Sequence, residues 1–237
     1  MDFQSFVVRW DKFWDKALQP AFYDRILLGL KNTFLIALIG FALGFLIGTV
    51  LAVFKLLPKN SKVGKVLSTI SDVYVAIFRG TPMVVQLLVA YYVVLPLLGV
   101  KATGLIVCEV MFGLNSAAYV CEIMRSGILS VDPGQMEAGR SLGLNYVQTM
   151  FRIVFPQAIK NILPTLGNEL IMLIKETSVA SFVGATDLFS AFQYIGSNNY
   201  EYMIPYLMMA VIYIVIIVIL TLLLKLLERR LRASDKR

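Results

Sequence analysis

Three long runs of this chain contain no charged residue. They cover Thr33–Phe54, Gly80–Val100 and Met203–Leu224, and each is 21 or 22 residues long. A helix rises about 1.5 Å per residue, so a helix of this length crosses a hydrocarbon core of about 30 Å. Only helices and closed β-barrels satisfy their backbone hydrogen bonds in lipid, and the runs lack the alternating pattern of barrel strands. We therefore expect an all-α, polytopic helical membrane protein.

The apolar segments together predict about five membrane-spanning helices. The expected spans lie at about 31–55, 66–98, 103–127, 159–183 and 203–226. The second is too long for one simple crossing, and Pro82 removes a backbone donor within it, so we expect a break there. The fourth is unusual for a span because Glu169, Lys175 and Glu176 fall inside it.

Basic residues gather beside one set of span ends. Five crossings put the N terminus outside and the C terminus inside, which places segments 55–65, 125–160 and 225–237 in the cytoplasm. These three segments hold 14 Lys and Arg residues, against 6 in the expected outer segments, as the positive-inside rule requires. The net charge of +7 therefore reflects membrane topology and does not indicate a nucleic-acid partner.

The N-terminal residues predict an amphipathic helix outside the spans. Aromatic side chains recur there at helical spacing, at Phe3, Phe6, Trp10, Phe13 and Trp14. Such a helix either lies in the membrane interface or packs its apolar face on the spans, and the sequence leaves both open. We divide the chain into this N-terminal segment at 1–28, a membrane domain at 29–232 and a cytoplasmic tail at 233–237.

Side chains that commonly hold metals or catalyse reactions are scarce. The chain has no histidine, and its two cysteines, Cys108 and Cys121, are thirteen residues apart on one expected helix. That spacing separates them by about 20 Å, too far for a disulfide bond, so we interpret both as packing residues. We expect no metal site, no bound cofactor and no enzymatic activity in this chain.

The segment Val131–Gln157 is polar and rich in helix signals, unlike the apolar spans on either side of it. Asp132 followed by Pro133 predicts a helix start, with Gln135 placed as in a capping box. Gly143 predicts the end of this helix, because glycine suits the left-handed conformation that follows many helices.

A second short helix is predicted after this glycine. Asn145 offers another N-cap, Gln148 stands three residues on, and Pro156 ends the segment. Two capped helices with apolar faces form either a packed connector between the third and fourth spans or a docking element for a cytoplasmic partner. The pattern alone favours neither.

At these residues the chain resembles a known family. The run Glu137-Ala138-Gly139, with Gly143 after three further residues and Ile153-x-Phe155-Pro156 after nine more, resembles the EAA loop of ABC importer permeases. That family pattern reads Glu-Ala-Ala, three residues, Gly, nine residues, Ile-x-Leu-Pro. This chain has Gly139 in place of the second Ala and Phe155 in place of Leu. The first change keeps a small residue, and the second keeps an apolar side chain.

Three other runs are similar to the polar amino acid uptake branch of that family. They are Phe78–Pro82, Asn115–Glu122 and Leu163–Glu169, and the likeness covers about residues 25–232. It implies an ABC type I importer permease-like fold. It also implies the transmembrane subunit of an ATP-driven importer, which moves polar amino acids across a bacterial inner membrane by alternating access.

The same resemblance implies several partners. In the family a cytoplasmic loop, here about 128–158, binds a separate ATPase subunit dimer that holds ATP and Mg²⁺. This chain itself lacks the G-x-x-x-x-G-K-[ST] phosphate loop of such an ATPase. A second permease subunit of the same or a related chain, an extracytoplasmic amino acid-binding protein and membrane lipid are implied as well. The expected coupling residues are Glu137, Ala138, Gly139, Gly143, Ile153 and Pro156.

Polar residues inside the spans are the candidates for contacting the amino acid, because charges in spans are costly and face the bundle interior. They are Asn115, Glu169, Arg79, Thr81, Ser116 and Glu122. An Arg guanidinium suits a carboxylate, and a Glu accepts hydrogen bonds from an ammonium group.

Arg79 and Glu122 also have a structural alternative, whereas Asn115 and Glu169 have no obvious neighbour of opposite charge. Arg79 has Asp72 or Glu122 as an ion-pair partner, and Glu122 has Arg125 one turn away, which we prefer for Glu122. Lys175 and Glu176 are interpreted as an interfacial or intra-protein pair.

Two other functions fit a membrane protein of this size. An ion- or proton-coupled secondary transporter commonly has internal repeats and broken helices in both halves, whereas only one broken span is predicted here. A non-transporting scaffold does not require Asn and Glu at helical spacing within its spans.

Overall fold

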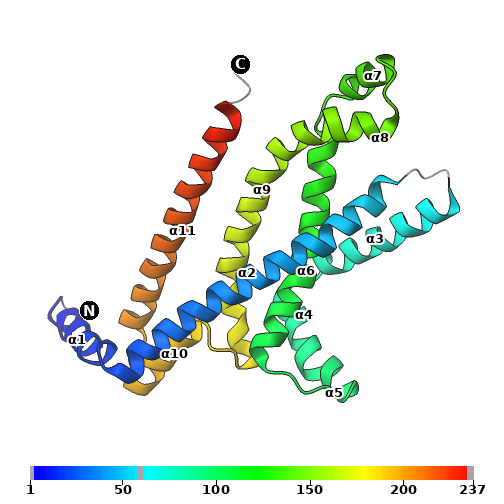
Figure 1. The fold of residues 1–237 in the computed structure, drawn as a ribbon. Coiled ribbons are helices and arrows are strands. Elements are labelled where there is room, and N and C mark those ends of the chain that lie inside the picture. Colours follow the sequence, from blue (N-terminus) through cyan, green and yellow to red (C-terminus); the bar gives the residue numbers. More distant parts are fainter. Residues whose placement is uncertain (1–2, 58–60, 234–237) are drawn as a thin grey trace. The chain divides into compact units, whose positions relative to one another are not determined.

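A computed structural model describes residues 3–57 and 61–233, and every regular element in those ranges is a helix (Figure 1). The long helices are α1 (Phe3–Ala17), α2 (Pro20–Leu56), α3 (Lys62–Gly80), α6 (Gly104–Leu129), α9 (Phe155–Glu176) and α11 (Met203–Ala233). The shorter elements are α4 (Met83–Val89), the π-helix η1 (Ala90–Val94), α5 (Leu95–Leu97), α7 (Pro133–Ser141), α8 (Tyr146–Thr149), the π-helix η2 (Met150–Val154), the 3₁₀-helix η3 (Thr177–Val183) and α10 (Leu188–Asn199). The all-α prediction is confirmed. Most of the expected tail at 233–237 lies outside the described residues.

Three described helices, α2, α6 and α11, are long and apolar enough to cross a membrane. A fourth span exists if α3 and the elements that follow it count as one broken span. Helix α9 corresponds to the fourth expected span and, with 22 residues, is long enough to cross. Its charged residues make it less apolar than the other three.

The second expected span is broken at the predicted place. Helix α3 ends at Gly80, Thr81 is extended with φ −124° and ψ 144°, and α4 begins at Met83. Pro82 has no N–H to donate, and its ring disfavours the helical conformation of the preceding residue. These two effects explain why Thr81 leaves the helix.

The fourth expected span, 159–183, differs in its second half. The α-helix ends at Glu176 and tightens into η3, where the hydroxyls of Thr177 and Ser178 donate to the carbonyls three residues earlier. Such side-chain bonds compete with the α-helical pattern. Lys175 and Glu176 interact electrostatically, as expected of an intra-protein pair, but they do not approach to salt-bridge distance.

The chain divides into two compact units. Unit 1 comprises Met1–Gly40, Met83–Phe112 and Leu173–Leu220, and unit 2 comprises Phe41–Pro82, Gly113–Met172 and Thr221–Arg237. Helices α2, α6, α9 and α11 each contribute one part to each unit.

In unit 1, the N-terminal helix α1 packs its apolar face on the chain. Phe13 and Ala17 are buried in a cluster with Phe192 of α10 and Ile204 of α11. Val8 on the same helix stays exposed. The packing alternative therefore holds for the second half of the amphipathic segment.

The loop before α10 is held against α2. Asn32 Nδ2 donates to the Thr186 carbonyl at 2.7 Å, and Thr33 Oγ1 accepts from the Leu188 N–H at 3.1 Å. Asp187 caps α10 by accepting from two backbone N–H groups. Burial raises the pKa of this carboxyl, and the capping hydrogen bonds partly oppose the rise.

In unit 2, small residues of α2 allow close packing on α6. A Cβ at Gly44 would lie 2.7 Å from Ser116 Cβ, and one at Gly48 would lie 2.7 Å from the Ala117 carbonyl oxygen. Glycines four residues apart thus let the two helices approach closely at these two positions. Helix α3 joins the same core, because Ser71 Oγ donates to the Leu51 carbonyl at 2.9 Å.

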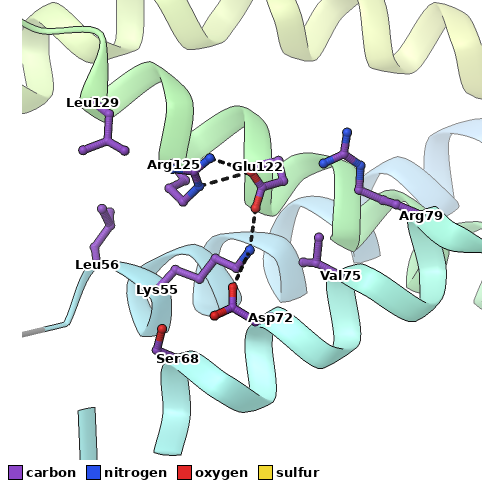
Figure 2. A pocket seen from close by; sticks show the side chains of 9 residues that line it. All are labelled: Lys55, Leu56, Ser68, Asp72, Val75, Arg79, Glu122, Arg125 and Leu129. Carbon is purple, nitrogen blue, oxygen red and sulfur yellow. Dashed lines mark hydrogen bonds and ion pairs between the residues drawn. The ribbon is translucent and has the colours of Figure 1, made fainter. Parts of the chain in front are cut away.

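Four charged side chains join α2, α3 and α6 at one end of that core (Figure 2). Lys55 Nζ lies 2.9 Å from Asp72 Oδ1 and 2.5 Å from Glu122 Oε1, and Arg125 donates to the other oxygen of Glu122 at 2.9 Å. Only 9% of the Lys55 side chain is exposed, whereas 55% of the Asp72 side chain is exposed. Lys55 is thus the buried centre of this network.

The network predicts unequal costs for its members. Lys55→Met leaves Glu122 and Asp72 without their shared cation and should lower the free energy of unfolding by about 3 kcal/mol. Asp72→Asn removes a largely solvated partner and should cost at most about 1 kcal/mol. Thermal unfolding of the detergent-solubilised protein measures both changes. Equal effects of the two substitutions would contradict the assignment of Lys55 as the centre.

Candidate functional site

Three of the predicted polar residues meet in the core of unit 2. Asn115 and Ser116 of α6 and Glu169 of α9 are all buried. Ser116 Oγ donates to Glu169 Oε1 at 2.9 Å, which fixes the carboxylate against α6. A buried carboxylate requires such donors, because an unsolvated charge without partners is costly.

The end of α3 adds two polar groups beside the same face of α6. Asn115 Nδ2 donates to the Phe78 carbonyl at 3.4 Å. The guanidinium carbon of Arg79 lies 5.3 Å from the centre of the Tyr119 ring, a cation–π contact. Thr81 is exposed, and its hydroxyl donates to the Ile77 carbonyl of its own helix.

Glu122 lies one turn beyond Tyr119 and has two cationic partners. Arg125 donates to it through Nε at 3.1 Å and Nη2 at 2.9 Å, and Lys55 contacts its other oxygen. The preferred structural alternative for Glu122 is thus formed. The alternative for Arg79 is not, since no described carboxylate lies within ion-pair distance of its guanidinium.

A cavity of about 620 Å³ opens beside these charges. Figure 2 shows Arg79 on one side of it and the Lys55–Asp72–Glu122–Arg125 network on another, with Leu56, Val75 and Leu129 as apolar walls. Its five charged groups sum to one positive charge, which favours an anionic group such as a carboxylate. Lys55 and Asp72 were not among the predicted site residues, because Lys55 is 67 positions from its partner Glu122 and 17 positions from its partner Asp72 in sequence.

The 131–157 segment forms the two short helices that its caps predict (Figure 1). Asp132 accepts from the Gly134 N–H at 2.8 Å, and Pro133 begins α7. The capping box predicted for Gln135 is not formed, because the Gln135 side chain accepts from Gln157 Nε2 instead.

Gly143 ends α7 as predicted. It has a φ of +84°, and hydrogen bonds run from the Gly143 N–H to Arg140 O and from the Leu144 N–H to Gly139 O. These two hydrogen bonds together form the Schellman motif, which needs a left-handed residue after the helix.

Asn145 starts α8 with a complete capping box. Its side chain accepts from the Gln148 N–H at 2.9 Å, and the Gln148 side chain accepts from the Asn145 N–H at 3.0 Å. Gly139 is buried where α7 meets this second helix, and a Cβ there would lie 2.4 Å from Thr149 Cγ2 and 2.9 Å from Ile153 Cδ1. This contact explains why glycine replaces the family's alanine at position 139.

The two helices leave a set of large apolar side chains uncovered. Among the described residues of this segment, Leu142, Tyr146, Val147 and Phe151 are 52–81% exposed, and we call them the loop patch. Of the predicted coupling residues, Glu137, Ala138, Gly143 and Pro156 are exposed, Ile153 is half-buried and Gly139 is buried. Capped helices that expose apolar side chains fit a docking element better than a plain connector.

Comparisons with known proteins agree with this architecture. The family of binding-protein-dependent transport system inner membrane components matches residues 44–233. The arginine transport system permease protein of Bacillus subtilis is 38% identical over 210 residues, which cover 89% of this chain and 94% of that protein. The L-cystine transport system permease protein of the same organism is 37% identical over 219 residues, covering 92% and 91%.

A solved structure is similar over nearly the whole chain. The crystal structure of an amino acid ABC transporter with histidines contains a chain that is 36% identical, with a TM-score of 0.82 and coverage of 97% of this chain and 99% of that one. None of these proteins is described as an ion-coupled carrier or a scaffold. The chain therefore belongs to the binding-protein-dependent transport system inner membrane components, as a multi-pass permease subunit of an amino acid ABC transporter.

Proposed function

We propose that this permease moves polar amino acids by alternating access and is driven by an ATPase subunit dimer that binds the 131–157 segment. The observation that carries the proposal is the loop patch, since two capped helices expose Leu142, Tyr146, Val147 and Phe151. Apolar side chains of that size at the centre of a rigid surface are typical of interface hot spots. ATP and Mg²⁺ belong to the ATPase in this scheme.

The amino acid is proposed to bind where α3, α6 and α9 meet in unit 2. The side-chain oxygens of Glu169 and Asn115 would accept hydrogen bonds from the α-ammonium group and so orient it. Arg79 would bind the α-carboxylate through its guanidinium. Ser116 holds Glu169 in place, and Thr81 is a neutral polar group near the break in the second span. Glu122, bound by two cations, would border the inner end of this pathway.

These contacts address the groups that all amino acids share. The similar permeases named for arginine and L-cystine carry cargoes with different side chains, so a site for the common ammonium and carboxylate groups suits the family.

The remaining partners follow from the membrane topology. A second permease chain, the same or related, would complete the pathway, and an extracytoplasmic binding protein would deliver the amino acid from outside. The N terminus would then lie outside and the C terminus inside, consistent with the basic residues Lys225, Arg229 and Arg230 at the end of α11.

Docking through the loop patch is tested by a matched pair of substitutions. Val147 and Val63 are exposed valines, each at the second position of its helix, where an acidic side chain favours the helix. Val147→Asp should therefore keep the fold but abolish co-purification of the ATPase and amino acid-stimulated ATP hydrolysis, and Val63→Asp should preserve both. Normal ATPase retention by Val147→Asp would refute docking at the patch.

The substrate site is tested by removing one charge. Glu169→Gln keeps an acceptor for Ser116 but loses the attraction to an ammonium group, and it should raise the KM for amino acid uptake about tenfold or more. Basal ATP hydrolysis should be unchanged, and Glu109→Gln, on α6 and outside the proposed site, serves as the control. Unaltered uptake kinetics in Glu169→Gln, measured in proteoliposomes with the binding protein, would exclude Glu169 from the site.

A further inference from the structure

A polar pocket of about 350 Å³ in unit 1 is lined by the start of α2, the end of η3 and one face of α10. We call it the Arg25 pocket, because Arg25 is the only charged residue among the described residues that line it. The other polar side chains around it are neutral, and they include Ser181, Gln193, Tyr194, Ser197 and Tyr202. The pocket belongs to unit 1, whereas the residues of the candidate amino acid site belong to unit 2.

Arg25 is held in this pocket by an aromatic ring rather than by an acid. Its guanidinium carbon lies 3.8 Å from the centre of the Tyr194 ring, and its Nε is buried without a hydrogen-bond partner. No described carboxylate lies within salt-bridge distance of it. Asp187 follows the lining residue Thr186, but its oxygens accept from backbone N–H groups at the start of α10. The terminal N–H groups of Arg25 can therefore donate to an oxyanion such as a carboxylate or phosphate.

The position of Arg25 along α2 sets its depth in the membrane. It precedes the uncharged run that starts at Thr33 by eight residues, about 12 Å of helix, and Leu27 and Leu28 in between are 45% and 46% exposed. The neighbouring Tyr23 is 52% exposed, and exposed tyrosines are typical of the level of the lipid headgroups. Arg25 therefore lies at the depth of phospholipid phosphates.

The neutral groups of the pocket discriminate between headgroups. The Ser181 hydroxyl donates to the Ser178 carbonyl at 3.0 Å, and the Ser197 hydroxyl donates to a carbonyl one turn earlier on α10 at 2.9 Å. Their remaining lone pairs can accept hydrogen bonds from a ligand that carries hydroxyls. An ammonium group would instead meet Arg25 without an acid in the lining to balance it. The pocket thus suits an anionic phosphate with a hydroxylated headgroup better than a zwitterion such as phosphatidylethanolamine or a free amino acid.

We propose that the Arg25 pocket is a binding site for phosphatidylglycerol. Arg25 binds the phosphate, Gln193 and the two serine hydroxyls bind the glycerol headgroup, and an acyl chain runs along Leu28, which is one turn nearer the membrane centre on α2. The site would attach the segment between η3 and α10 to the lipid surface. It requires neither the ATPase nor the amino acid, so its failure would leave the proposed function untouched.

Native mass spectrometry of the detergent-purified transporter, titrated with defined lipids, tests the site. The protein should bind phosphatidylglycerol at least about tenfold more tightly than phosphatidylethanolamine, and Arg25→Gln should remove most of this preference by weakening phosphatidylglycerol binding about tenfold. Lys31→Gln removes the same charge from an exposed position of α2 outside the pocket. It should change the affinity at most about twofold.

Three results would overturn the proposal. Equal losses in Arg25→Gln and Lys31→Gln would mean that phosphatidylglycerol is attracted only by the net charge of this end of α2. Equal affinities of the unaltered protein for the two lipids would exclude recognition of the glycerol headgroup. Glycerol phosphate without acyl chains that binds as tightly as phosphatidylglycerol would identify a site for a free phosphate ester rather than for a lipid.

A second variant decides the matter if Arg25→Gln does not fold. Gln193 is exposed on α10, so Gln193→Trp should fill the pocket while the fold and Arg25 remain in place. It should weaken phosphatidylglycerol binding about tenfold, because the bulky ring excludes the headgroup. Unchanged affinity in Gln193→Trp, with an unchanged thermal unfolding midpoint, would show that the lipid binds elsewhere.

Discussion

The cost of leaving a polar group unpaired in hydrocarbon governs most of this structure. Where Pro82 interrupts a span, the hydroxyl of Thr81 donates a hydrogen bond to the Ile77 carbonyl in the last turn of α3. Where a carboxylate is buried, Ser116 or Lys55 supplies a donor.

Local patterns in the sequence predicted the features that are themselves local. The apolar runs, the break at Pro82, the cap at Asn145 and the left-handed Gly143 each depend on neighbouring residues, and the structure contains all of them. Gln135 was mispredicted because its distant partner Gln157 competes with the local cap. The partners of Lys55 were unpredictable for a similar reason, since they come from two other helices.

The candidate site shows how burial changes the meaning of a residue type. Glu122 and Glu169 are both acids in expected spans, and the structure places them differently: Glu122 is half-buried and contacts Lys55 and Arg125, whereas Glu169 is buried and accepts a hydrogen bond from Ser116. Sequence spacing identified both residues but not this difference.

Helices α8, η2 and α9 follow one another without a gap from Tyr146 to Glu176. The surface at Tyr146 and Val147 and the carboxylate of Glu169 are therefore carried by one continuous helical segment, which contains the π-helical turn η2 and Pro164 inside α9. Gly139 lets α7 press directly on that segment. A tilt imposed on the cytoplasmic end would therefore travel to Glu169 along one continuous helical backbone, and η2 and Pro164 are the two places where that backbone can bend.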